Sequence, residues 1–174
     1  MKHAFFILFL FPLIVLSQEN EDFKIYKNKN YSIEYPLNWN LDTSGDNGTE
    51  IYIYPKESNN SEIFVENINL LIQNLNDSTA TIESCKILVE QQIEAMMTDS
   101  KFIVSEIVNK DKHKFHKLIA EGTYNTYKFK TIIYTWYFNK HIYTLTFVTL
   151  SEDYINNHTL ALKIMDSFSL ENNN

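Results

Sequence analysis

The chain has 174 residues, of which 44% are hydrophobic and 14% are aromatic, and this is enough apolar material for one domain with a substantial core. Its formal net charge is −7, and every basic residue is a lysine, because arginine is absent. An acidic chain without arginine lacks the groups that usually hold phosphates and bases, so the composition argues against nucleic acid as a partner.

The N-terminus has the pattern of a secretory signal peptide. A positively charged start precedes a nearly unbroken apolar run, Ala4–Leu16, and the chain turns polar directly afterwards. The run is shorter than the roughly 20 residues that cross a bilayer, and no cysteine lies near the expected cleavage after Ser17. We therefore predict a signal peptide over residues 1–17, a single domain over 18–174, and an exported protein, periplasmic or secreted, without a transmembrane anchor.

The first part of the expected domain has the pattern of strands joined by polar loops. Tyr31–Tyr35 alternates apolar or aromatic residues with polar ones, which is the period of a half-buried strand, and Pro36 ends it. Trp39 is expected in the short loop that follows. We also expect strands over Ile51–Tyr54 and Ile63–Asn74, and Phe23–Lys27 can form a further one.

The hydrophobic period then changes from two to between three and four. Apolar residues at this spacing predict an amphipathic helix over Ile82–Met96, with polar residues 77–79 capping its start and 98–100 ending it. The single cysteine, Cys85, lies on the apolar stripe of this helix. The chain therefore cannot form an internal disulfide, and we interpret Cys85 as a buried core residue rather than a reactive thiol.

The rest of the chain predicts four more strands and a closing helix. The last two strands have the two-residue connection Asn139-Lys140, and both faces of this hairpin carry apolar or aromatic groups, so we expect the sheet to be covered on both sides. Ser151 is expected to cap the closing helix, on which Ile155 and Met165 would face the sheet. The four predicted strands are Phe102–Val108, Phe115–Tyr124, Phe129–Phe138 and His141–Leu150.

Two segments of the chain resemble the PsbP-like family. The first, Tyr31-x-Ile33-x-Tyr35-Pro36-x-x-Trp39, is similar to the first strands of these domains, and the second, Ile164–Phe168, is similar to their end. The family includes the extrinsic photosystem II protein, a Ran-binding nuclear import factor and many bacterial envelope proteins.

The predicted elements follow the order βββαββββα, with about six to seven strands and two main helices. The resemblance implies that they form an α+β fold, in which an antiparallel sheet is flanked by helices. Proteins of this fold serve mainly in binding and assembly, and the resemblance implies no shared catalytic residues. We interpret Tyr35, Pro36 and Trp39 as a structural motif, in which the proline ends a strand and the indole fills the end of the sheet.

One short segment is a candidate docking patch on this acidic chain. It comprises Lys110, Lys112, His113, Lys114, His116 and Lys117. One hypothesis is that the patch binds an anionic partner, such as a lipid headgroup or a polysaccharide. The alternative is a solvated hairpin whose lysines discourage edge-to-edge pairing of strands.

The two histidines of this patch do not indicate a metal site. A three-residue spacing on a strand places His113 and His116 on opposite faces, and no third ligand is evident. We therefore expect neither a metal nor a cofactor.

The motifs of several large enzyme classes are missing. The chain has three glycines, too few for a phosphate-binding loop, and it lacks Gly-x-Ser-x-Gly, His-Glu-x-x-His and Cys-x-x-Cys. Carboxylate pairs that meet only in space stay possible, because a sequence does not show them.

These observations favour a non-catalytic function over catalysis. The asparagine-rich, arginine-free composition is typical of an AT-rich bacterial genome. From the predicted leader, the resemblance and the missing catalytic motifs, we predict a binding or assembly module of the bacterial cell envelope. Another envelope protein is the expected partner. Two alternatives stay open: a periplasmic hydrolase acting on an extracellular polymer, and an immunity or chaperone-like partner of an exported toxin.

Overall fold

The computed structural model describes residues 22–56, 64–75, 79–110 and 113–171, so the predicted signal peptide lies outside the described residues. The helices are α1 (Ile82–Met96) and α2 (Tyr154–Asp166), and a short 3-10 helix covers Asp46–Gly48. The strands are β1 (Phe23–Lys27), β2 (Tyr31–Pro36), β3 (Trp39–Asp42), β4 (Ile51–Pro55), β5 (Asn67–Asn74), β6 (Thr98–Lys110), β7 (His113–Tyr124), β8 (Tyr127–Phe138), β9 (His141–Leu150) and β10 (Ser169–Leu170).

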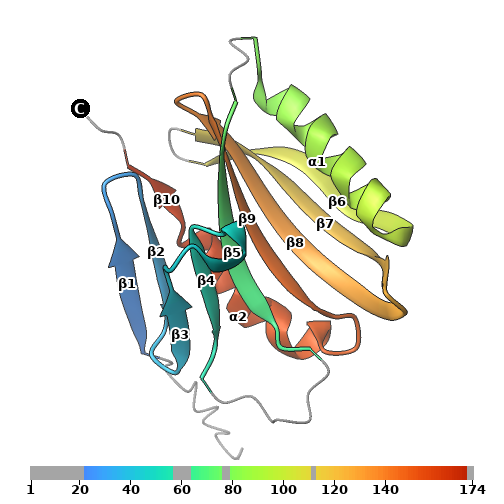
Figure 1. Ribbon diagram of the computed structural model, residues 1–174, viewed down its shortest axis with the longest axis horizontal. Coiled ribbons are helices and arrows are strands. Elements are labelled where there is room, and N and C mark those ends of the chain that lie inside the picture. Colours follow the sequence, from blue (N-terminus) through green and yellow to red (C-terminus); the bar gives the residue numbers. More distant parts are fainter. Residues whose placement is uncertain (1–21, 57–63, 76–78, 111–112, 172–174) are drawn as a thin grey trace, which may run out of the picture.

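The strands form two antiparallel sheets. The larger has seven strands in the order β3-β4-β5-β9-β8-β7-β6, and the smaller has three in the order β1-β2-β10. The large sheet is strongly curved, with α1 in front of β6 to β8 and α2 behind the sheet (Figure 1). The predicted α+β class, with a seven-stranded antiparallel sheet and two main helices, is therefore confirmed.

The element order departs from the expected βββαββββα in its short strands. Five strands precede α1, and β10 follows α2. Trp39 begins β3 instead of lying in a loop, and β3 and β10 have four and two residues. Segments of that length are too short to show a period, so their pairing with distant strands decides their conformation.

The caps of both helices differ from the expected ones. The N-cap of α1 is Thr81, whose hydroxyl accepts a hydrogen bond from the Ser84 backbone N–H. The Ser84 hydroxyl in turn accepts one from the Thr81 backbone N–H. The N-cap of α2 is Asp153, not Ser151, and it makes no side-chain capping bond. Residues 77 and 78 lie outside the described part of the chain, and residues 98–100 belong to β6 rather than ending α1.

The prediction that Ile155 faces the sheet is wrong. Its side chain is 78% exposed, whereas Met165 is fully buried as expected. Tyr154 lies seven residues, about two turns, before the buried Ala161, and its side chain packs against the core. Ile155 is the next residue, about 100° further around the helix, and therefore points to solvent.

Two cores lie on opposite faces of the large sheet. The main core joins the sheet, the small sheet and α2, and it contains Tyr35 and Trp39, which are 6% and 5% exposed. The second core lies beneath α1, where Val89, Ile93 and Met97 pack against β7 and β8. Both faces of the central strands are thus covered, as their apolar pattern predicted.

Candidate functional site

A groove of about 390 Å³ lies between α1 and the sheet, on the face opposite α2. Its wall and floor are formed by α1 with the residue after it, by β8 and by β9. The lining residues are Val89, Gln92, Ile93, Met96, Met97, Thr131, Ile133, Thr144, Thr146 and Val148. None of these side chains is charged, although the chain as a whole carries a net charge of −7.

The groove exists because α1 covers only part of the sheet. The buried stripe of the helix is Cys85, Val89 and Ile93, which rests on the sheet. A second row, Leu88 and Met96, lies beside this stripe and remains 39% and 52% exposed. Beneath that row, strand alternation turns threonine, valine and isoleucine side chains of β8 and β9 toward the α1 side.

A second hollow of about 280 Å³ lies beside the first half of α1. Leu88 and Cys85 line it, together with Leu75 at the end of β5. Leu88 is one helical turn before Gln92 of the groove, so the apolar surface continues along the same side of the helix.

A polar cluster lies beneath the middle of α1, next to these apolar surfaces. Ser105 of β6 donates a hydrogen bond to Glu90 Oε1 and lies 3.2 Å from Nε2 of His116 on β7. Lys86 Nζ donates to the same Glu90 oxygen at 2.7 Å. The His116 side chain is fully buried.

The charges of this cluster follow from burial and from its hydrogen bonds. Burial lowers the pKa of His116 to about 4, against the opposing effect of Glu90 and with a further lowering by Lys86. Partial burial opposes ionisation of Glu90, but hydrogen bonds from Lys86 and Ser105 outweigh it and lower the Glu90 pKa. At neutral pH, His116 is therefore neutral and Glu90 is ionised.

The cluster has the residue types of a Ser-His-acid triad but not its geometry. In a triad the two ring nitrogens of the histidine serve different partners, the serine and the acid. Here Ser105 and Glu90 both approach Nε2, at 3.2 and 3.8 Å, and no described residue makes a hydrogen bond to Nδ1. Because Ser105 is bonded directly to Glu90 and His116 is buried, these groups do not present an activated nucleophile to a substrate.

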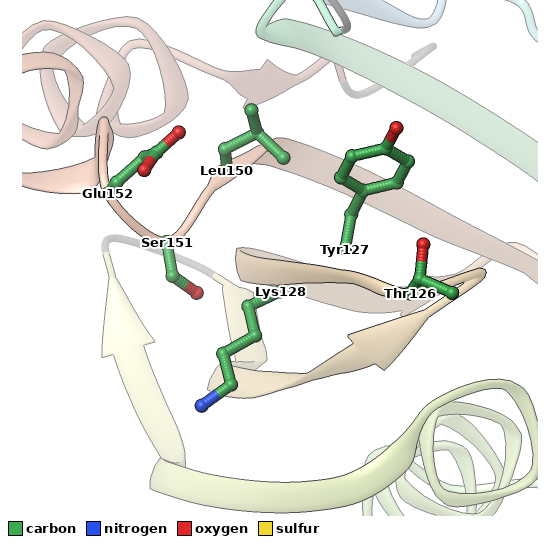
Figure 2. A pocket seen from close by; sticks show the side chains of 6 residues that line it. All are labelled: Thr126, Tyr127, Lys128, Leu150, Ser151 and Glu152. Atoms are coloured by element: carbon green, nitrogen blue, oxygen red, sulfur yellow. The ribbon is translucent and has the colours of Figure 1, made fainter.

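A further hollow of about 460 Å³ lies where β8 begins and β9 ends. Figure 2 shows that its side chains do not converge: Tyr127 and Leu150 point to one side of the strands, and Lys128 and Ser151 to the other. Within the described residues Ser151 Oγ has no hydrogen-bond partner, so neither Lys128 nor Glu152 is positioned as its base. This hollow does not have the arrangement of a catalytic site.

The structure divides the candidate docking patch between two faces of the sheet. Lys110 and Lys117 line one hollow of about 490 Å³ together with Glu106, Tyr134 and Asp166. Lys110 donates to the backbone oxygen of Asp166, and the Tyr134 hydroxyl donates to its carboxylate at 2.9 Å.

The other patch residues lie elsewhere. The His113 ring packs 5.0 Å from that of Phe138, on the α2 side. Lys114 is on the opposite face, His116 is buried beneath α1, and Lys112 lies outside the described residues. The two histidines thus occupy opposite faces, as expected, and the described residues hold no group of three His, Cys, Asp or Glu side chains that could bind a metal.

Sequence reasoning did not identify the groove. The sequence does contain one sign of the groove, which is the second apolar row of α1. A single buried stripe does not account for Leu88 and Met96. Within the described residues, neither helix is long and apolar enough to cross a membrane.

Neither a protein family model nor a curated protein sequence matches the chain. Solved structures do match. The cyanobacterial PsbP protein CyanoP from Synechocystis sp. PCC 6803 has a TM-score of 0.63 at 12% identity, over 88% of this chain and 95% of CyanoP. LpqN, involved in cell envelope biogenesis of Mycobacterium tuberculosis, has a TM-score of 0.64 at 8% identity, over 90% of this chain and 88% of LpqN.

A Pseudomonas aeruginosa protein of unknown function, PA94, also matches, with a TM-score of 0.58 at 10% identity, over 83% of this chain and 94% of PA94. All three likenesses combine high coverage with low identity. They therefore establish the fold and leave the function to the residues of this chain.

Proposed function

We propose that this chain, whose fold is PsbP-like, is a non-catalytic binding or assembly module of the bacterial cell envelope, exported to the periplasm or secreted. The observation that carries the proposal is the uncharged groove beside α1. Its volume of about 390 Å³ falls within the range of ligand and side-chain pockets, and its lining is mainly apolar with a few hydroxyl and amide groups.

The groove has the composition of the centre of a protein interface. Such centres are depleted in charge and enriched in methionine, and Met96 and Met97 both line this groove. Flexible thioether side chains adapt to the shape of a partner. Another envelope protein with an apolar segment is therefore the partner that we propose.

The proposed location rests on two further supports. The apolar N-terminal run over Ala4–Leu16 has the length of a signal peptide. LpqN, one of the proteins that share the fold, is described as acting in cell envelope biogenesis.

The hydrolase alternative has one specific observation in its favour. Glu106 and Asp166 line the same hollow, so two carboxylates do meet in space. The same hollow also contains Lys110 and Lys117, and Tyr134 donates a hydrogen bond to Asp166. The hollow thus mixes both signs of charge, and a hydrogen bond from Tyr134 already occupies the Asp166 carboxylate, so we place binding first.

Site-specific crosslinking tests the proposal. A photoreactive amino acid at position 96 should capture one reproducible envelope protein in the bacterium that makes this chain. The same group at position 155, which is 78% exposed on α2, should not capture it. Replacing Met96 by lysine should weaken capture from a neighbouring groove position such as Gln92, whereas the matched change Ile155→Lys should not. Equal labelling from both positions would contradict a binding role for the groove.

A further inference from the structure

Two polar atoms on paired residues of β7 and β8 lack hydrogen-bond partners among the described residues. Among the described residues, the buried side-chain atoms without a partner are Tyr31 Oη, His116 Nδ1, Thr135 Oγ1 and Ser151 Oγ. His116 and Thr135 are cross-strand partners in the β7–β8 register, and both side chains are fully buried. Leaving one such atom unpaired in the interior is unfavourable, and two side by side call for an explanation.

Both side chains face the α1 side of the sheet. Thr135 alternates along β8 with Thr131 and Ile133, which line the groove beneath α1. In the other direction across the sheet, His116 is paired with Ile107 of the edge strand β6. The two unpartnered atoms therefore lie in the layer between the sheet and α1, whose Lys86 and Glu90 belong to the same polar cluster.

The hydrogen bonds of the cluster determine which nitrogen of His116 carries the proton. An ionised Glu90 only accepts hydrogen bonds, so the Ser105 hydroxyl donates its one proton to it. Ser105 can then only accept in its 3.2 Å contact with His116, which requires a proton on Nε2. Because His116 is neutral at pH 7, its Nδ1 is left as a bare acceptor.

Thr135, the cross-strand partner of His116, carries a buried hydroxyl without a partner, and a hydroxyl both donates and accepts. An acceptor and a hydroxyl on adjacent strands match the hydrogen-bonding capacity of one water molecule. We propose that a single ordered water is bound between His116 Nδ1 and Thr135 Oγ1. The water donates one hydrogen bond to the nitrogen and makes a second one with the hydroxyl, as donor or as acceptor. Such a water is part of the protein interior, because it satisfies two buried polar groups that otherwise lack partners.

A crystal structure in which ordered water is visible is the direct test. Density for one water within hydrogen-bond distance of both atoms is the expected result. A direct bond between His116 Nδ1 and Thr135 Oγ1, or a site with neither water nor a direct bond, would overturn the proposal. So would a different bound species, such as an ion.

Nuclear magnetic resonance in solution gives an independent readout. The ring nitrogen shifts of His116 should show a protonated Nε2 and a bare Nδ1, and the opposite tautomer would overturn the assignment. Water cross-relaxation to the Thr135 methyl group should be seen in the native protein and lost in Thr135→Val, which keeps the shape and removes the hydroxyl. Thr135→Ser, which keeps the hydroxyl, should retain water contact with the His116 ring. Should Thr135→Val not fold, the native protein and Thr135→Ser still decide the result.

Discussion

Glu90 on α1 and His116 on β7 lie 3.8 Å apart, yet they do not form an ion pair at neutral pH. The fully buried imidazole has its pKa lowered to about 4, with burial as the main cause, while the carboxylate stays ionised and is paired with Lys86. The polar cluster beneath α1 thus contains one ion pair, between Lys86 and Glu90, and one neutral histidine. Protonation of His116 would place a charge in this buried cluster, so the stability of the fold depends on pH.

We predict that the native protein loses stability as the pH falls from about 6.5 to about 4. An unfolded chain protonates His116 near pH 6.5, whereas the folded chain does so only near pH 4, so the unfolded state binds more protons within this window. Stability therefore rises with pH, and the contribution is complete above the unfolded value. Its full size is on the order of 3 kcal/mol.

Urea unfolding measured across this pH range checks the prediction. His116→Gln should remove most of the slope between pH 6.5 and 4.5. Glu90 acts in the same direction. Because its pKa is lowered from 4.5 in the folded protein, protonating it costs further stability, but only as the pH falls below 4.5. His141→Gln, which removes a partly exposed histidine at the β8–β9 turn, is the control. A slope that survives in His116→Gln would contradict the assignment.

The long periodic segments of the fold were predictable. The helix over Ile82–Met96 and the hairpin around Asn139-Lys140 followed from spacing, and both turn residues have the positive φ values, 49° and 62°, that a two-residue hairpin needs. The strands β3 and β10 were not predictable, because their conformation depends on pairing with β4 and β2 and not on a local pattern.

The candidate site was much less predictable than the fold. His116 was grouped with lysines because of its place in the sequence, although strand alternation also sets it on the same face as Leu118 and Ala120. The groove depends on how far α1 covers the sheet. A helix position is set by packing across the whole core, so no short stretch of sequence encodes it.

Gly122 on β7 is required by the close approach of the chain that leaves α1. A Cβ atom at this position would lie 2.8 Å from Met97 Cβ and 3.3 Å from Ser100 Cα. We predict that Gly122→Ala lowers the free energy of unfolding by about 1–3 kcal/mol, as is usual for overpacking.

The nature of this clash sets its control. Because the nearest atom is the Met97 Cβ, Met97→Ala keeps that atom and should not rescue Gly122→Ala in denaturant unfolding. Full rescue by Met97→Ala would show that the thioether end of the side chain, not the backbone approach, limits the space.

Cys85 is expected to be unreactive in the folded protein. Its side chain is 1% exposed, and burial raises its thiol pKa, with a smaller opposing hydrogen bond from Ser84 and a further raising by Glu83. A disulfide reagent should therefore label the native protein at least roughly tenfold more slowly than the urea-unfolded chain. Equal rates would contradict the buried position and favour a reactive thiol.

The candidate docking patch is testable by splitting it along the two faces of the sheet. Lys110 and Lys117 share one hollow, whereas Lys114 lies on the opposite face. If the patch binds an anionic surface, the double change Lys110→Gln with Lys117→Gln should weaken sedimentation with anionic lipid vesicles. Removing charges also lowers the salt dependence of binding, which gives a second readout.

Lys114→Gln removes one charge from the other face, so its matched counterparts are the single changes Lys110→Gln and Lys117→Gln, each of which also removes one charge. Vesicle binding should be weakened by either of these single changes and little changed by Lys114→Gln. Equal loss in all three would indicate attraction by net charge alone, without a defined face. Unchanged binding in every variant would leave the lysines as solvated residues that protect the β6 edge from pairing with another strand.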